Sequence, residues 1–226
     1  MADMFISSIK FHSNLKKRLG VAFATLVLLT SFGLLAPSAF AFSAPDRVGK
    51  ADIGFDLSGA ISSDSDINST FYVGGNMSYG INEWFAVGVS LGREEFSAND
   101  ITVGSATIPG PDIAGHPLFL DFIFRKYMPD KAYVPYGVLG AGIIWWKSQD
   151  VTASNGIQYE ASVDSALGFK LGGGVDWFMN DKWALNLNFD YVLTTSSAPL
   201  SNGSISVRDD VNLDYWNLGG GIKYLF

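Results

Sequence analysis

The chain has 226 residues and no cysteine, so it cannot form a disulfide bond. Its formal net charge of −7 argues against nucleic acid as a partner, because nucleic-acid-binding surfaces are basic. Hydrophobic residues make up 48% of the chain, and its length allows one sizeable domain.

Residues 1–41 have the features of an export signal. A basic region contains Lys10, Lys16, Lys17 and Arg18. The apolar run Leu19–Leu35 follows, and Ala39-Phe40-Ala41 supplies a small-x-small cleavage site. A membrane anchor is the alternative, but the apolar run is short and a Pro/Ser/Ala stretch follows it at once. We therefore predict a cleaved signal peptide at 1–41 and one domain at 42–226.

From Lys50 onward, the chain divides into segments in which apolar and polar residues alternate. The eight segments span about 51–59, 69–79, 84–96, 118–125, 133–147, 167–178, 183–193 and 213–226. In the clearest of them Leu185, Leu187 and Phe189 alternate with Asn186 and Asn188. Only a β-strand sends alternate side chains to opposite faces, so the sequence predicts an all-β antiparallel protein.

The connections between these segments alternate in length. Long polar connections occupy about 60–68, 97–115, 148–164 and 194–210, and short turns lie between them at 80–83, 128–131 and 179–182. Outer-membrane barrels have short periplasmic turns, long external loops and an even strand number, whereas a soluble β-sandwich has no reason to keep this order. No run of 18 apolar residues follows the signal, so any membrane crossing must use strands. We predict an eight-stranded antiparallel up-and-down transmembrane β-barrel in the cell outer membrane.

The last predicted strand ends on an aromatic residue. Ile222, Tyr224 and Phe226 share one face of this strand. A terminal aromatic strand resembles the signal that the barrel-assembly machinery reads, so we expect these residues to be the assembly signal and that machinery to be a partner. Trp84, Tyr127, Trp177 and other aromatics also lie near strand ends, as membrane-interface girdles require.

Three stretches carry a family resemblance: Pro135–Gly142, Gly174–Leu187 and Lys223–Phe226. In these stretches the sequence resembles the OmpW-like family of small outer-membrane β-barrels, while the first three strands match only by pattern. The resemblance implies an eight-stranded barrel with a narrow apolar passage that helps small hydrophobic molecules cross the outer membrane.

The polar face of the predicted strands contains many charged residues. If the bulky apolar face meets lipid, these charges point into a barrel that is just wide enough for side chains. Buried charges must be paired or hydrated, so we expect a structural network; its acidic excess also allows some carboxylates to face water or a cation. The predicted interior network contains Asp52, Asp56, Glu94, Asp121, Arg125, Lys170, Asp176, Asp190 and Lys223.

A second candidate site is an apolar mouth near the long loops. The segment 133–147 is apolar on both faces, so its register cannot be assigned from the pattern. The candidates are Leu139, Ile143 and Trp145, or their neighbours in that segment, together with Leu213 and Tyr215. Such a mouth would receive small hydrophobic solutes, although ordinary loop packing explains the same residues.

The sequence offers little for catalysis or metal binding. His116 is the only histidine after the signal and has no nucleophile in a recognisable arrangement, so a lipid-modifying enzyme is disfavoured. Asp64, Asp66 and Asn68 have the spacing of a calcium loop, but Ser69 stands where glycine is needed and the later glutamate is missing. We predict no enzyme activity, no metal and no cofactor.

The leading functional prediction is a passive conduit for small hydrophobic molecules. The alternative is a non-transporting structural or surface-interaction barrel whose loops contact lipopolysaccharide, a host or phage. In both cases the expected partners include outer-membrane lipid and lipopolysaccharide, with a small hydrophobic solute in the first.

Overall fold

The computed structural model describes residues 43–103, 106–128, 131–154, 156, 158–161, 163–194, 196–201, 206–211 and 213–226. The predicted signal peptide lies outside the described residues and stays a prediction. Within the described part of the chain, no helix is long and apolar enough to cross a membrane.

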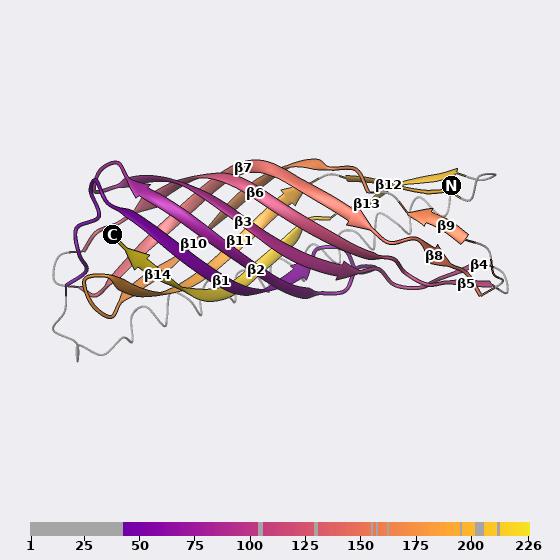
Figure 1. Ribbon diagram of the computed structural model, residues 1–226, viewed down its shortest axis with the longest axis horizontal. Helices are drawn as coiled ribbons and strands as arrows, with labels where there is room; N and C mark the ends of the chain where they lie inside the picture. Colours follow the sequence, from indigo (N-terminus) through magenta and orange to yellow (C-terminus); the bar gives the residue numbers. More distant parts are fainter. Residues whose placement is uncertain are drawn as a thin grey trace, which may run out of the picture. The chain divides into compact units, whose positions relative to one another are not determined.

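Eight long strands form the main structure. They are β1 (Ala51–Ser62), β2 (Thr70–Gly80), β3 (Phe85–Ser97), β6 (Asp112–Arg125), β7 (Tyr133–Ser148), β10 (Ala166–Phe178), β11 (Trp183–Thr194) and β14 (Tyr215–Leu225). They pair in the order β1-β14-β11-β10-β7-β6-β3-β2, and β1 also pairs with β2, which closes the barrel (Figure 1). Every pairing is antiparallel, so the predicted eight-stranded up-and-down barrel is confirmed.

The long connections contain short strands that the sequence pattern did not predict. These are β4 (Ile101–Val103), β5 (Ala106–Ile108), β8 (Val151–Thr152), β9 (Gln158–Ala161), β12 (Ser196–Ser201) and β13 (Ser206–Val211). β4 pairs with β5, while β13, β12, β9 and β8 form a four-stranded sheet. The prediction that these connections are loops is therefore partly wrong. Backbone pairing beyond the barrel does not require a buried apolar face, so it leaves no alternating pattern in the sequence. We call this end of the barrel the loop side, and the end with the short connections the turn side.

The outward face of the barrel is apolar. On β1, Ile53, Phe55 and Leu57 are half exposed or more, whereas the alternating Asp52 and Asp56 are buried. The other barrel strands repeat this arrangement, with large exposed hydrophobic side chains around the ring. A water-soluble protein rarely exposes a continuous apolar surface, so this is a surface suited to lipid.

Aromatic side chains gather at both ends of the outward face. On the turn side, the rings of Trp183 and Tyr224 lie 4.8 Å apart, and those of Tyr224 and Phe226 lie 5.1 Å apart. On the loop side, Trp216 packs against Tyr191, with ring centroids 4.2 Å apart. Amphipathic rings are favoured at membrane–water interfaces, so the two groups fit the predicted girdles.

The interior is layered along the barrel axis. A small apolar group near the turn side, the turn-side cluster, contains Ala44, Val134, Phe178, Ala184 and Leu225. A larger group near the loops, the loop-side cluster, contains Ala60, Ile67, Phe96, Ile113, Phe119, Ile144, Trp146, Val192, Leu213 and Tyr215. Polar and charged side chains fill the space between the two clusters.

Candidate functional site in the barrel interior

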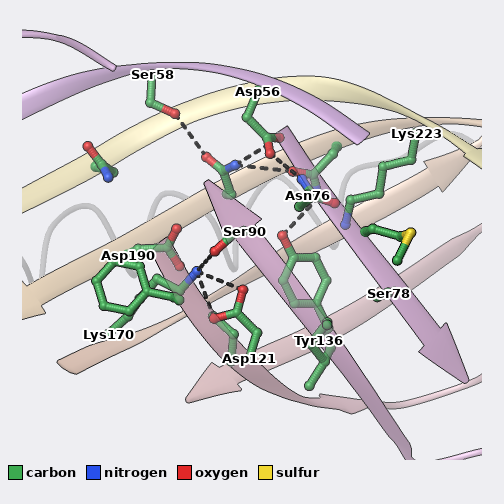
Figure 2. A pocket seen from close by; sticks show the side chains of 18 of the residues that line it. Asp56, Ser58, Asn76, Ser78, Ser90, Asp121, Tyr136, Lys170, Asp190 and Lys223 are labelled. Carbon is green, nitrogen blue, oxygen red and sulfur yellow. Dashed lines mark hydrogen bonds and ion pairs between the residues drawn. The ribbon is translucent and has the colours of Figure 1, made fainter. Parts of the chain in front are cut away.

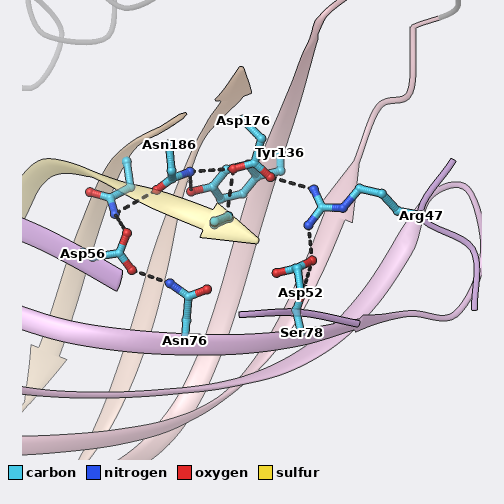
Figure 3. A network of polar contacts seen from close by, with 10 residues as sticks. Arg47, Asp52, Asp56, Asn76, Ser78, Tyr136, Asp176 and Asn186 are labelled. Atoms are coloured by element: carbon cyan, nitrogen blue, oxygen red, sulfur yellow. Dashed lines mark hydrogen bonds and ion pairs between the residues drawn. The ribbon is translucent and has the colours of Figure 1, made fainter. Parts of the chain in front are cut away.

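The turn-side mouth is occupied by the segment that precedes β1. Ala44 is buried there, and its backbone N–H donates to the carbonyl of Lys131 at 2.7 Å. Three residues later, Arg47 points into the barrel and forms ion pairs with Asp52 and Asp176 (Figure 3). The contact from Arg47 Nη1 to Asp176 Oδ2 measures 2.6 Å. This segment therefore closes the mouth with buried, charge-assisted contacts.

Asp176 on β10 is the centre of the polar network. In addition to Arg47, it accepts Lys223 Nζ at 2.9 Å and Asn186 Nδ2 at 2.7 Å. Asn186 Nδ2 also donates to the Tyr136 hydroxyl at 2.9 Å. Asp176 is 2% exposed, so its charge is stabilised by these partners rather than by solvent.

A second part of the network lies nearer the loops. Asp56 accepts hydrogen bonds from Asn76 and from Asn188, the latter at 3.2 Å. Lys170 Nζ donates to Asp121 Oδ2 at 2.9 Å and to Ser90 Oγ at 2.8 Å (Figure 2). A cavity of about 70 Å³ remains among these side chains, with room for a few water molecules.

The structure places all nine residues of the predicted network on the inner face of the barrel. Seven of them line one connected polar region: Asp52, Asp56, Asp121, Lys170, Asp176, Asp190 and Lys223. Arg125 lines the same cavity, but within the described residues its three guanidinium nitrogens have no hydrogen-bond partner. Glu94 lies apart from the network, beside the loop-side cluster.

The predicted interior network did not include Arg47, Tyr72 or Tyr136. Arg47 was missed because it precedes the first strand, where no alternation marks an inward position. Tyr72 and Tyr136 alternate correctly, but an aromatic residue is equally at home on the lipid face. The Tyr72 ring lies over Gly74 and Gly92, where a Cβ atom would collide with it. Glycine at both positions therefore admits this large ring to the interior.

The predicted apolar mouth is only partly assembled. Leu139, Ile143 and Trp145 are 47%, 42% and 43% exposed on the outward face, so they do not line the interior. Leu213 and Tyr215 are buried inside. The inward positions of β7 belong instead to the neighbours of the three outward residues, which include Val138, Ile144 and Trp146. The register could not be read from the sequence because both faces of this strand are apolar.

The pairing ladder between β3 and β6 is interrupted near the loop side, and its register is the same before and after the interruption. Leu91 pairs with Leu118 and Glu94 with Gly115, but Gly92 and Arg93 are not paired with Pro117 and His116, although all four are described. On their other edges these residues keep their partners in β2 and β7. Proline has no N–H to donate, so the ladder loses a hydrogen bond at Pro117. We call this interruption the β3–β6 seam.

No group of three or more potential metal ligands is found among the described residues. His116 lies on β6 opposite Trp145 of β7 and outside the polar network. Among the described residues, the interior thus offers paired charges, apolar packing and a small cavity, and no arrangement of nucleophile and base.

Comparisons with known proteins agree with this architecture. Residues 24–226 match the family model described as the outer membrane protein beta-barrel domain. The chain is similar to the crystal structure of the outer membrane protein OprG from Pseudomonas aeruginosa, with a TM-score of 0.70 and 18% identity over 80% of this chain and 98% of that one. No protein of curated function matches the sequence significantly.

Two further solved structures share the fold. A major outer membrane protein from Thermus thermophilus has a TM-score of 0.51 and 11% identity, covering 78% of this chain and 99% of that one. The outer membrane protein AlkL in lipid bilayers has a TM-score of 0.50 and 16% identity, covering 85% and 97%. At these identities the likeness concerns the fold alone.

Proposed function

The chain belongs to the outer-membrane β-barrel family and resides in the cell outer membrane, and from this premise we propose that it is a passive conduit for small hydrophobic molecules. In this proposal the solute enters the apolar loop-side interior and leaves sideways into the membrane through the β3–β6 seam. The single observation that carries the proposal is that this interruption of the wall lies beside an apolar interior.

Direct passage along the axis is disfavoured by the filled turn side. Arg47, which precedes β1, and Lys223 on β14 both pair with Asp176 on β10 inside the barrel. An apolar molecule that moved through this region would have to separate buried ion pairs without replacing their hydrogen bonds, which is strongly unfavourable. A sideways route avoids the network altogether.

The loop-side cluster suits an apolar solute. Its side chains include Phe96, Ile144 and Trp146, all at most 5% exposed. Each methylene group moved from water to such an environment gains about 0.8 kcal/mol, so a short alkyl chain would partition into this layer.

The β3–β6 seam is the weakest part of the wall near this layer. In hydrocarbon each unsatisfied backbone group is costly, so a barrel normally pairs all of them. At Pro117 one ladder hydrogen bond is already absent, and the strands on either side can separate there with less loss. Tyr72 lies directly inside, with its hydroxyl donating to the carbonyl of Leu91 at 3.3 Å.

A disulfide across the seam tests this route. Arg93 and His116 occupy opposite outward positions, and the chain has no cysteine of its own. We expect oxidised Arg93→Cys/His116→Cys to slow uptake of an apolar fluorescent dye by cells of a Gram-negative host at least threefold, and reduction to restore it.

The matched control joins position 93 to Val73 on β2, the strand on the other side of β3. Val73→Cys/Arg93→Cys places a disulfide at the same position of β3, where β2 and β3 are already paired. Dye uptake should be unchanged by oxidation in this variant. Equal slowing in both double variants, or in neither, contradicts exit through the seam, and absence of any uptake above empty cells favours the non-transporting barrel.

The proposal involves no catalytic step. It retains the barrel-assembly machinery as a partner that reads Ile222, Tyr224 and Phe226. Exposure of Ile222 and Phe226 on the outward face supports this role, since such a partner must reach them. Lipopolysaccharide is retained as a neighbour of the outward loop-side surface, where Arg93 is exposed.

A further inference from the structure

Glu94 is a buried carboxylate with too few hydrogen-bond partners. It is 1% exposed, and within the described residues neither of its carboxylate oxygens accepts a hydrogen bond of ordinary geometry. Its carboxylate and the Trp146 ring both lie against Gly115. Asp52, Asp56, Asp121 and Asp176 of the polar network each accept a hydrogen bond of ordinary geometry, and Glu94 differs from them in this respect.

Two neighbouring groups share this lack of partners. The Tyr215 hydroxyl lies beside Glu94 and is the group that can donate to it, but the contact falls outside ordinary hydrogen-bond geometry. Trp146 Nε1 is also buried without an acceptor. A carboxylate, a hydroxyl and an indole N–H thus project from apolar surroundings, where unsatisfied polar groups are unfavourable. Such groups require an explanation, and a ligand with a polar end supplies one.

The position of Glu94 connects it to both the cavity and the seam. Tyr215, Phe119 and Val192 belong to the loop-side cluster and also line the cavity. Glu94 and Gly115 form the first pair of the β3–β6 ladder on the loop side of the interruption. A molecule held at Glu94 would therefore have apolar side chains around its body and the interrupted wall beside it.

We propose that Glu94 binds the polar head of an otherwise apolar small molecule, which donates a hydrogen bond from a hydroxyl or ammonium group while its apolar tail lies in the loop-side cluster. This inference rests on the proposed function and defines its solute class as amphipathic molecules with a hydrogen-bond donor. Purely apolar molecules should bind more weakly at Glu94 because they cannot donate to its oxygens, and carboxylate-headed molecules should bind more weakly because they bring only acceptors.

The test compares isomers with and without a donor. The full mature chain in lipid nanodiscs is titrated with 1-heptanol, heptylammonium and hexyl methyl ether, the last being an isomer of heptanol that lacks an O–H. The readout is the ¹⁵N–¹H signal of the Trp146 indole, assigned with Trp146→Phe. We expect the chemical-shift change of this signal to saturate with heptanol, heptylammonium or both at a concentration at least tenfold below that needed with the ether.

Two variants make the test specific. Glu94→Leu should remove the preference for the donor-bearing probes, whereas Glu95→Leu, on the outward face of the same strand, should keep it. The other indole signals report whether each barrel remains folded. Equal responses to heptanol and the ether in the wild type, or an undiminished preference in folded Glu94→Leu, would overturn the proposal.

The binding result is independent of transport. If heptanol binds through Glu94 while the seam disulfide leaves dye uptake unchanged, the site stands and the proposed route fails. If the seam disulfide slows dye uptake while heptanol and the ether bind alike, the route stands and the assignment of Glu94 fails. Preference for heptylammonium over heptanol indicates a charged Glu94, and the reverse indicates a neutral carboxyl group.

Discussion

The two halves of the barrel interior treat buried charge in opposite ways. On the turn side, Asp176 is surrounded by Arg47, Lys223 and Asn186, each within hydrogen-bond distance. On the loop side, Glu94 is equally buried, but within the described residues no cation is paired with it and its polar neighbour is the Tyr215 hydroxyl. The two acids come from the same alternating pattern, yet one completes a network and the other interrupts an apolar layer.

This difference separates structural roles from candidate functional roles. The ion pairs and hydrogen bonds around Asp176 stabilise the barrel and block the axis, so these groups have little left to offer a solute. An incompletely satisfied group in an apolar layer reduces stability, and natural proteins retain such groups mainly at functional sites. The comparison therefore supports the proposal that the turn side closes the barrel and the loop side contacts the solute.

The largest expected loss of stability follows from removing the charge at the centre of the turn-side network. Asp176→Asn leaves Arg47 and Lys223 buried without their shared anion, so the free energy of unfolding should fall by about 3–5 kcal/mol. Urea unfolding of the protein refolded into lipid vesicles measures this change. A loss below about 1 kcal/mol would show that water or another carboxylate replaces Asp176 readily.

A smaller effect distinguishes paired from unpaired cations. Lys170→Met removes the hydrogen bonds that Lys170 donates to Ser90 and Asp121. The free energy of unfolding should fall by about 1–3 kcal/mol. Arg125→Met removes a buried cation that makes no hydrogen bond among the described residues, so the change should stay within about 1 kcal/mol. Unfolding midpoints of the two variants should therefore differ, and equal losses would show that Arg125 stabilises its neighbours without direct contact.

A weaker effect concerns the seam. Pro117→Ala restores an N–H at the interruption, which allows a ladder hydrogen bond worth about 0.5–1.5 kcal/mol to form. The unfolding midpoint should rise while dye uptake falls. If the new amide at position 117 of the variant exchanges its hydrogen much faster than a paired amide in β6, another constraint keeps the strands apart.

The smallest effect is expected on the outer surface. Arg93 and Glu95 form an ion pair with side chains 62% and 59% exposed. Glu95→Gln should change the free energy of unfolding by less than about 1 kcal/mol, because exposed ion pairs contribute little. The same urea titration checks this value, and a larger loss would indicate that lipid shields the pair from water.

The fold was predictable because it depends on the two-residue period of the strands and on the order of long and short connections. Alternation in segments such as 183–193 identified strands, and the alternation of long and short connections identified the barrel. Both follow from backbone geometry and need no knowledge of partners across the barrel. The short strands β4, β5, β8, β9, β12 and β13 were missed, since their pairing lies outside the ring and leaves no comparable pattern.

The candidate site was predictable only in part. Alternation placed all nine charged residues inside, but it could not tell which acids would meet a cation. Asp176 and Glu94 differ in their neighbours across the barrel, and those neighbours come from distant strands and from Arg47 in an irregular segment. The apolar β7 gave no sign of its register, so Leu139 was assigned to the mouth when Ile144 and Trp146 occupy the interior.

The pairing of the first strand with the last has a consequence for how the molecule is made. Asp52 lies opposite Leu225, so the ring closes only when residues from both ends of the domain are present together. No intermediate with fewer strands can satisfy all its backbone groups in lipid. Synthesis and export must therefore be nearly complete before insertion, and a ribosome cannot release this barrel into the membrane strand by strand.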